Sequence, residues 1–367
     1  MPPPAGRDFR AASCKPPAGG RERVLPRTIG LAMTSSLPQI SWLGAGKSVR
    51  GAAHLRSGLP NQDAIGWQPE FGPSPRLVLA VSDGHGSAKC LRSDVGARLA
   101  IEAAIHVMRQ FLESKADSVT LSLVKRTAEE RLPQELVKDW LERVKQHHQG
   151  MPFDSVELEA LASKEGAVVR QSVEDNPVLA YGATLLVAYV AESFAIYLQQ
   201  GDGDIVIVSD AGEVTRPLPQ DDRLFANETT SLCGPNAWRD FRVRFQILTE
   251  AKPALLLLST DGYANSFRDD KSFLQVGADV LELIRAEGLN ALDDKLETWL
   301  ADASRQGSGD DITLGIVCRA DLAETVPPAS AAGTSGAAEV SAAGAAAPAG
   351  PPTENCQANP SAVVVRA

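Results

Sequence analysis

The 367-residue sequence has only five cysteines, an odd number, and no two of them form a C-x-x-C pair. This pattern argues against a disulfide framework and a zinc–thiolate site, and it favours a reducing compartment. The sequence also lacks an apolar run near the roughly 20 residues that span a bilayer, and it has no apolar signal-peptide core at its start. We therefore expect a cytoplasmic protein that makes no use of a membrane.

An excess of basic residues is also missing. The sequence carries 36 Lys and Arg against 46 Asp and Glu, a formal net charge of −10. Nucleic-acid binding needs a basic face, so nucleic acid is not an expected partner. Hydrophobic residues make up 44% of the chain, which is enough for a sizeable core. The acidic balance fits a protein that gathers divalent cations.

Composition divides the chain into three parts. Residues 1–37 are rich in Pro, Gly, Ala and Arg and show no helical or strand period, which predicts a disordered N-terminal extension. Residues 320–367 form an Ala/Pro/Gly-rich tail with almost nothing large to bury, and we expect it to be disordered as well. The folded domain is predicted to cover residues 40–319.

Within that domain the pattern runs from strands to helices, back to strands, to helices and to a last strand. Strands are expected at 64–68, 76–82, 183–190, 193–199, 205–209, 241–248, 254–259 and 312–317. Helices are expected at 91–112, 118–146 with an interruption at Pro133, 155–173, 271–286 and 289–304. Because strict βαβ alternation is absent, this order predicts an α+β fold with antiparallel sheets covered by helices.

Aspartates recur at the ends of the expected strands. Asp83 and Asp261, each followed by glycine, stop two apolar strands abruptly; Asp202 follows a third strand, and Asp63 and Asp310 precede two others. Carboxylates gathered at one rim repel one another, and hard divalent cations remove that repulsion. Two such ions about 3.5–4 Å apart form the two-metal site that hydrolyses phosphate esters.

Asp-Gly is also an ordinary turn dipeptide, and any one of these motifs alone is better explained as a turn. Asp210 with Gly212 is interpreted in that way, as a plain hairpin. Five acidic positions with the same placement at strand ends are harder to assign to turns alone.

Together these segments resemble the type 2C metal-dependent serine/threonine protein phosphatases, in a bacterial branch. The matching segments span most of the folded domain: Asn61-Gln62-Asp63-Ala64, Asp83-Gly84-His85-Gly86, Tyr181-Gly182-Ala183-Thr184, Gly201-Asp202-Gly203, Ser259-Thr260-Asp261-Gly262 and Gly309-Asp310-Asp311-Ile312-Thr313. The resemblance implies two antiparallel sheets packed as a sandwich, with helices on the outer faces. It also implies hydrolysis of phosphoserine and phosphothreonine on proteins by a hydroxide that bridges two divalent ions, Mn²⁺ or Mg²⁺.

The resemblance assigns roles to individual residues. Asp83 would bridge both ions and Gly84 would offer its carbonyl to one of them, while Asp261 and Asp310 would ligate the other. Asp63 would hold metal-bound waters. Asp202, with Thr184 nearby, would support a third, weaker ion. His85 would protonate the departing serine or threonine oxygen as a general acid.

The sequence departs from the family where the substrate phosphate is held. The family often has an arginine five residues before the position of Asp63, and Gly58 stands there in this chain. His54, Arg56 or Arg50 could take over that contact. Gln62 replaces a common glutamate, and Asp311 replaces a common asparagine.

Two other functions remain open at this point. The missing arginine also fits a phosphatase-like regulatory or binding module with weak activity. A phosphotransfer enzyme with an aspartate nucleophile would need Asp-x-Asp after its first strand, but His85 occupies the second acidic place. The expected partners are phosphorylated protein substrates and a cognate serine/threonine kinase, and the chain is expected to be a monomer.

Overall fold

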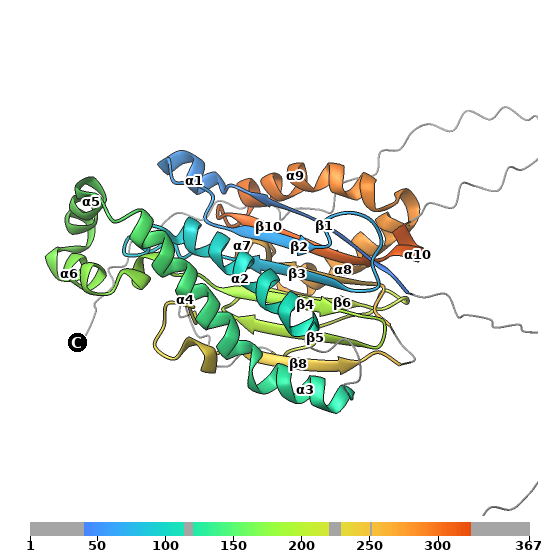
Figure 1. Ribbon diagram of the computed structural model, residues 1–367. Helices are drawn as coiled ribbons and strands as arrows, with labels where there is room; N and C mark the ends of the chain where they lie inside the picture. The colour runs from blue at the N-terminus through green and yellow to red at the C-terminus, as the bar shows by residue number, and fades with distance from the viewer. Residues whose placement is uncertain (1–39, 114–119, 220–228, 250–251, 324–367) are drawn as a thin grey trace, which may run out of the picture. The chain divides into compact units, whose positions relative to one another are not determined.

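The computed structural model describes residues 40–113, 120–219, 229–249 and 252–323 (Figure 1). The segment 1–37 and residues 324–367 of the predicted tail lie outside these ranges, so their predicted disorder stays a prediction. The first four residues of that tail, 320–323, are helical in the structure. None of the helices in the described part of the chain is long and apolar enough to cross a membrane.

The described strands form two five-stranded sheets in which every neighbouring pair is antiparallel. The first sheet has the order β1 (Trp42–Val49), β10 (Ile312–Arg319), β9 (Leu255–Ser259), β6 (Asp204–Val208) and β7 (Val214–Thr215). The second has the order β2 (Ala64–Gln68), β3 (Leu77–Ser82), β4 (Leu185–Val190), β5 (Phe194–Gln200) and β8 (Arg242–Ile247). The predicted antiparallel α+β architecture is confirmed.

Helices cover the outer face of each sheet (Figure 1). On the second sheet lie α2 (Ser93–Glu113), α3 (Leu121–Glu130) and α4 (Leu132–Gly150), and on the first lie α8 (Asp270–Glu287) and α9 (Leu289–Gln306). The remaining helices and 3₁₀ turns are short: α1 (Ala52–Ser57), α5 (Ser155–Glu165), α6 (Ala167–Asp175), η1 (Pro177–Tyr181), η2 (Ala237–Arg239), α7 (Asp261–Ala264) and α10 (Ala320–Ala323).

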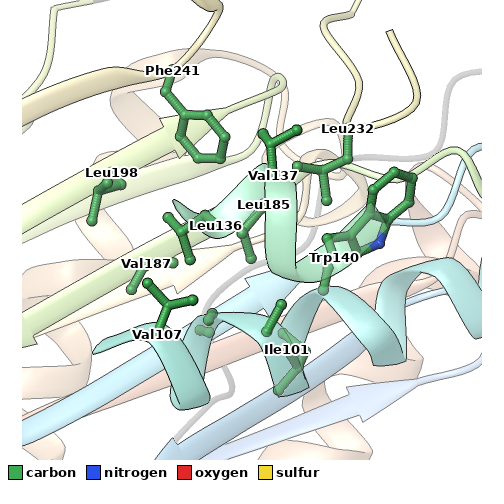
Figure 2. Close-up of a cluster of buried hydrophobic side chains, with 14 of the residues drawn as sticks. Ile101, Val107, Leu136, Val137, Trp140, Leu185, Val187, Leu198, Leu232 and Phe241 are labelled. Atoms are coloured by element: carbon green, nitrogen blue, oxygen red, sulfur yellow. The ribbon is translucent and has the colours of Figure 1, made fainter. Parts of the chain in front are cut away.

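Three apolar clusters hold these layers together: one beneath α2 and α4, one beneath α8 and α9, and one between the two sheets. Figure 2 shows the first of these, where Leu136 and Trp140 of α4 meet Leu185 and Val187 of β4. Trp140 is fully buried and its indole Nε1 donates to the carbonyl of Gly96, 3.0 Å away. Burial of such side chains is the main force that holds helix to sheet.

Most predicted elements agree with the structure to within a few residues, with one difference among the predicted helices. The helix expected at 155–173 is two helices, because Gly166 between them has φ +90, a conformation that breaks a helix. The break expected near Pro133 is present, and Pro133 occupies the first turn of α4, where its missing N–H costs nothing.

Strand β1 and helix α1 are absent from the prediction. β1 contains Gly44 and Gly46, which weaken the apolar pattern of a strand. The structure explains both glycines: a Cβ on Gly44 would lie 2.5 Å from the ring of Trp67, and one on Gly46 would lie 2.6 Å from Ile65. The glycines therefore let the two sheets approach each other closely at this strand.

Candidate functional site

The strand register brings the predicted acidic positions to one end of the sandwich. In the first sheet, Ser259 at the end of β9 pairs with Asp204 at the start of β6 and with Leu314 near the start of β10. In the second sheet, Ser82 at the end of β3 pairs with Ala64 at the start of β2. Since antiparallel strands alternate in direction, these starts and ends lie together at one end of the sandwich, which we call the rim. In Figure 1 the rim is the end near the label α1, and α10 lies at the opposite end.

Asp83 leaves β3 at this rim and its backbone is fixed on both sides. Its N–H donates to the Thr184 hydroxyl at 3.0 Å, and its carbonyl accepts from the Thr184 N–H at 2.8 Å. Gly84 follows in a site with no room for a side chain, since a Cβ would lie 2.6 Å from the carbonyl oxygens of both Gln62 and Ser93. Among the described residues no hydrogen bond ends on the Gly84 carbonyl, so that oxygen is available to a ligand.

Asp261 occupies the same kind of position in the first sheet. β9 ends at Ser259, and the short helix α7 begins at Asp261 itself. A Cβ on Gly262 would lie 2.2 Å from the Asp311 carbonyl oxygen and 3.3 Å from the Asp310 side chain. The glycine therefore allows the turn that carries Asp261 to pack directly against the turn that carries Asp310.

Asp63 is buried between the two sheets' ends and is held by hydroxyl groups from the opposite sheet. Its Oδ2 atom accepts from Thr260 Oγ1 and from Thr313 Oγ1, both at 2.8 Å. The N–H of Thr313 in turn donates to Thr260 Oγ1 at 2.9 Å. These bonds fix the Asp63 carboxylate without a cationic side chain.

The carboxylates of the rim act on one another electrostatically. Burial raises the pKa of Asp83 well above its usual value, and the nearby charges of Asp63, Asp261 and Asp202 raise it further. Burial likewise raises the pKa of Asp261, with contributions from Asp202 and Asp310, although a hydrogen bond from the Asp83 carboxyl lowers it. Burial also raises the pKa of Asp63, against the opposing effect of its hydrogen bonds to Thr313 and Thr260.

No Lys or Arg of the described residues forms an ion pair with Asp63, Asp83, Asp202, Asp261 or Asp310. Within the same residues, no three His, Cys, Asp or Glu side chains already converge as ligands of one ion. The Asp83 and Asp261 carboxyls instead lie close enough to each other to shift each other's pKa. The donors themselves, carboxylates and a backbone carbonyl, are those that hard divalent cations prefer, so the residues fit a Mg²⁺ or Mn²⁺ centre in chemistry.

His85 lies in the loop that follows Gly84. Its backbone N–H donates to the Gly182 carbonyl at 3.0 Å, and its ring lies against Gly182, where a Cβ would be 2.7 Å from the ring carbon Cδ2. Burial lowers the pKa of His85, and the charge of Asp202 opposes that shift. The structure thus brings His85 within electrostatic reach of the acidic cluster, as a proton donor to a bound ester would require.

Asp202 and Thr184 are neighbours at the rim. A Cβ on Gly201, which precedes Asp202, would lie 2.4 Å from the Thr184 methyl group. The Thr184 hydroxyl is already the acceptor for the Asp83 N–H. Thr184 therefore supports the turn of Asp83 as well as lying beside Asp202.

The two predicted phosphate contacts, His54 and Arg56, both lie on α1 and differ in exposure. The Arg56 side chain is exposed, whereas the His54 side chain is only 13% exposed and its Nδ1 lies 2.8 Å from Asp311 Oδ2. Gly58, at the position of the missing arginine, ends α1 with φ +76. That conformation favours glycine and explains the departure at this position.

Sequence reasoning assigned no part to Thr260, Thr313 or Asp311. Each lies inside one of the motifs identified in the sequence, but its hydrogen-bond partners are distant in the sequence. Asp311 is 3% exposed and accepts from backbone N–H groups 249 and 260 residues away. Only the folded chain reveals such contacts.

Asp210 is a turn residue, as predicted. It lies in the β6–β7 hairpin at the end of the first sheet opposite to the rim, with Gly212 at φ +78. Its carboxylate pairs with Arg319 at 2.8 Å and approaches Arg285 at 3.7 Å.

Comparison with known families gives one match over more than half of the chain. A family model described as protein phosphatase 2C matches residues 50–301, a segment that includes Asp63, Asp83, Asp202 and Asp261 and ends before Asp310. No curated protein matches the chain.

Several solved structures are similar at low identity. One is the catalytic domain of the serine/threonine protein phosphatase PstP in complex with two manganese ions, at 18% identity and TM-score 0.43, covering 76% of this chain and 99% of that chain. Another is PppA, a key regulatory component of T6SS in Pseudomonas aeruginosa, with 18% identity and a TM-score of 0.43. That match covers 76% of this chain and 97% of that chain. A third is the serine/threonine phosphatase Stp1 from Staphylococcus aureus, with 16% identity and a TM-score of 0.45. That match covers 75% of this chain and 94% of that chain.

Proposed function

Because the chain belongs to the protein phosphatase 2C family of metal-dependent protein phosphatases, we propose that the acidic rim is its active site. The substrates are proteins that carry phosphoserine or phosphothreonine. The observation that carries this proposal is the group of mutually repelling carboxylates that no Lys or Arg of the described residues neutralises. Such a group is costly to bury unless cations balance it.

Asp83, the Gly84 carbonyl, Asp261 and Asp310 would hold two divalent ions, Mn²⁺ or Mg²⁺. Asp202 would add a third, weaker site next to Thr184. When bound, such ions supply a nucleophilic hydroxide at neutral pH and offset the charge of the phosphate. The tight packing at Gly84 and Gly262 supports this assignment, because it fixes the adjacent aspartates on rigid strand ends.

The side chains of this chain perform the remaining tasks. Asp63, held by Thr260 and Thr313, would orient water at the rim through its other oxygen. His85 would give its ring proton to the departing serine or threonine oxygen. The lowered pKa makes its protonated form a stronger acid toward that oxygen. His54 on α1, together with Arg56 or Arg50, is the proposed contact to the substrate phosphate.

The test is phosphate release from a phosphothreonine peptide by the purified full chain, with and without Mn²⁺. We expect activity that depends on the metal and disappears in Asp83→Ala. Equal release by the two proteins would remove the support for an active site at this rim. A protein that binds the peptide but releases no phosphate at any Mn²⁺ or Mg²⁺ concentration would instead indicate the phosphatase-like binding module.

The domain limits, the partners and the assembly state are part of the same proposal. Residues 40–319 would form the catalytic unit, and the chain would act as a cytoplasmic monomer on the products of a serine/threonine kinase. Capture experiments with Asp261→Asn test the substrate class, because a variant that cannot turn over should retain phosphoproteins. If the active chain retains the same phosphoproteins equally well, the kinase partnership has no support.

A further inference from the structure

Asp311 is a buried carboxylate that ties three separate segments together at the rim. Its Oδ1 accepts from the Gly51 N–H at 2.6 Å, and its Oδ2 accepts from the Gln62 N–H at 2.6 Å. The same Oδ2 lies 2.8 Å from Nδ1 of His54. Since a carboxylate that serves other N–H donors can only accept, the Nδ1 atom must carry the hydrogen of this bond. One side of the His54 ring is therefore fixed.

Helix α1 is packed onto the turn that carries Asp310. The N–H of Ala53 donates to the Gly309 carbonyl at 2.8 Å, and the N–H of Ala52 donates to the Ser304 hydroxyl at 3.0 Å. A Cβ on Gly51 would lie 2.3 Å from the carbonyl carbon of Asp310. His54 sits in the same turn of helix, so its ring is placed beside a proposed metal ligand by backbone contacts.

A cationic side chain with an unused donor lies next to His54. Arg50 follows directly on β1, and its Nη2 donates to the His54 carbonyl at 3.0 Å. Its Nε atom is buried and has no hydrogen-bond partner among the described residues. A buried N–H of a guanidinium without an acceptor is costly, and a bound anion would remove that cost.

We propose that His54 and Arg50 form the subsite for the substrate phosphate, and that Asp311 is the residue that positions His54 within it. This rests on the proposed function of the rim. The subsite would replace the arginine that is missing at Gly58. Asp311 holds the ring at Nδ1, which leaves Nε2 for a phosphate oxygen, and the Arg50 guanidinium beside it would add charge-assisted hydrogen bonds to the same phosphate.

The first test measures how tightly the Mn²⁺-loaded full chain binds inorganic phosphate, by calorimetry and as a competitive inhibitor of phosphopeptide hydrolysis. His54→Ala and Arg50→Met should each weaken phosphate binding by roughly ten-fold to a hundred-fold, the usual effect of a lost charge-assisted hydrogen bond. The KM for the phosphopeptide should rise in parallel while kcat changes little. Leu55→Ala is the matched control, since this neighbour on α1 is 61% exposed.

The second test isolates Asp311. Asp311→Asn turns one oxygen into an N–H group that faces donors, so it should weaken phosphate binding and also lower the melting temperature. In a double-mutant cycle, the effect of Asp311→Asn on phosphate binding should nearly vanish in the His54→Ala background, whereas its effect on stability should persist. A binding effect that persists in full without His54 would show that Asp311 does not act through the histidine.

Failure of this inference is distinguishable from failure of the proposed function. If both His54→Ala and Arg50→Met bind phosphate as the unmodified chain does, while metal-dependent turnover is intact, the subsite lies elsewhere. If phosphate binding depends on these residues but the unmodified chain releases no phosphate from the peptide, the subsite stands and the proposed enzymatic activity is wrong.

Discussion

The aspartates at the two ends of the first sheet differ in whether a cationic side chain pairs with them. At the end marked by α10, Asp210 and Asp321 pair with the guanidinium of Arg319, both at 2.8 Å. At the rim, burial and mutual repulsion raise the pKa values of Asp83 and Asp261, and no Lys or Arg of the described residues pairs with either. Both ends contain Asp and Gly at a chain reversal, so the dipeptide pattern alone does not separate a turn from a site. The presence or absence of a compensating cation does.

The largest contrast is expected from one isosteric change made at each end. Asp83→Asn should lower kcat/KM for a phosphopeptide by about a thousand-fold or more, because several kcal/mol of transition-state stabilisation depend on the ions it would hold. The same variant should melt at a higher temperature in a chelator, because a buried charge next to like charges has been removed. Asp210→Asn should do the reverse, with unchanged activity and a slightly lower melting temperature. Equal effects of the two substitutions on activity would contradict the comparison.

Glycine-to-alanine substitutions test the backbone of the two ends. A Cβ at Gly262 would lie 2.2 Å from the Asp311 carbonyl oxygen, whereas at Gly212 the nearest atom would be 3.9 Å away. Gly262→Ala should therefore cost about 3 kcal/mol of unfolding free energy by overpacking, and it should also reduce activity by displacing Asp261. Gly212→Ala should cost only about 1 kcal/mol, because φ is +78 there, with activity preserved. Urea unfolding monitored by circular dichroism gives both values.

Much of this contrast could be predicted from the sequence, since strands such as 254–259 end visibly at an aspartate and the order of the motifs was specific. The parts that could not be predicted depend on contacts between distant segments. The bonds from Asp311 to Gly51, His54 and Gln62 span 249 to 260 residues. β1 was not predicted because its glycines, which weaken the strand pattern, are required by close contact with Trp67 and Ile65 of the opposite sheet. Local pattern carries no information about such partners.

Stabilisation of the fold by divalent cations should depend on the aspartates of the rim and not on those at the opposite end of the sheet. A ligand that binds only the folded chain raises the unfolding free energy by about 2.7 kcal/mol at a hundred times its dissociation constant. Adding Mn²⁺ or Mg²⁺ after a chelator should therefore raise the melting temperature of the unmodified chain, measured by differential scanning calorimetry. Asp210→Ala should keep this increment and Asp83→Ala should lose most of it. An increment of the same size in Asp83→Ala would place the bound ions away from the rim.

The smallest effect is expected at the end marked by α10, where Arg319→Met removes the guanidinium that Asp321 and Asp210 share. The hydrogen bond from Arg319 lowers the pKa of Asp321 below its unfolded value. The resulting stabilisation is therefore present above the unfolded pKa, near 3.9, and is lost as the pH falls through the folded one. Because both carboxylates are more than half exposed, Arg319→Met should cost less than about 1 kcal/mol at pH 7. Urea unfolding at pH 7 and pH 3 should show this difference from the unmodified chain shrinking in acid, while phosphatase activity stays unchanged. A difference that grew in acid would mean that Arg319 stabilises the fold through its packing and not through these carboxylates.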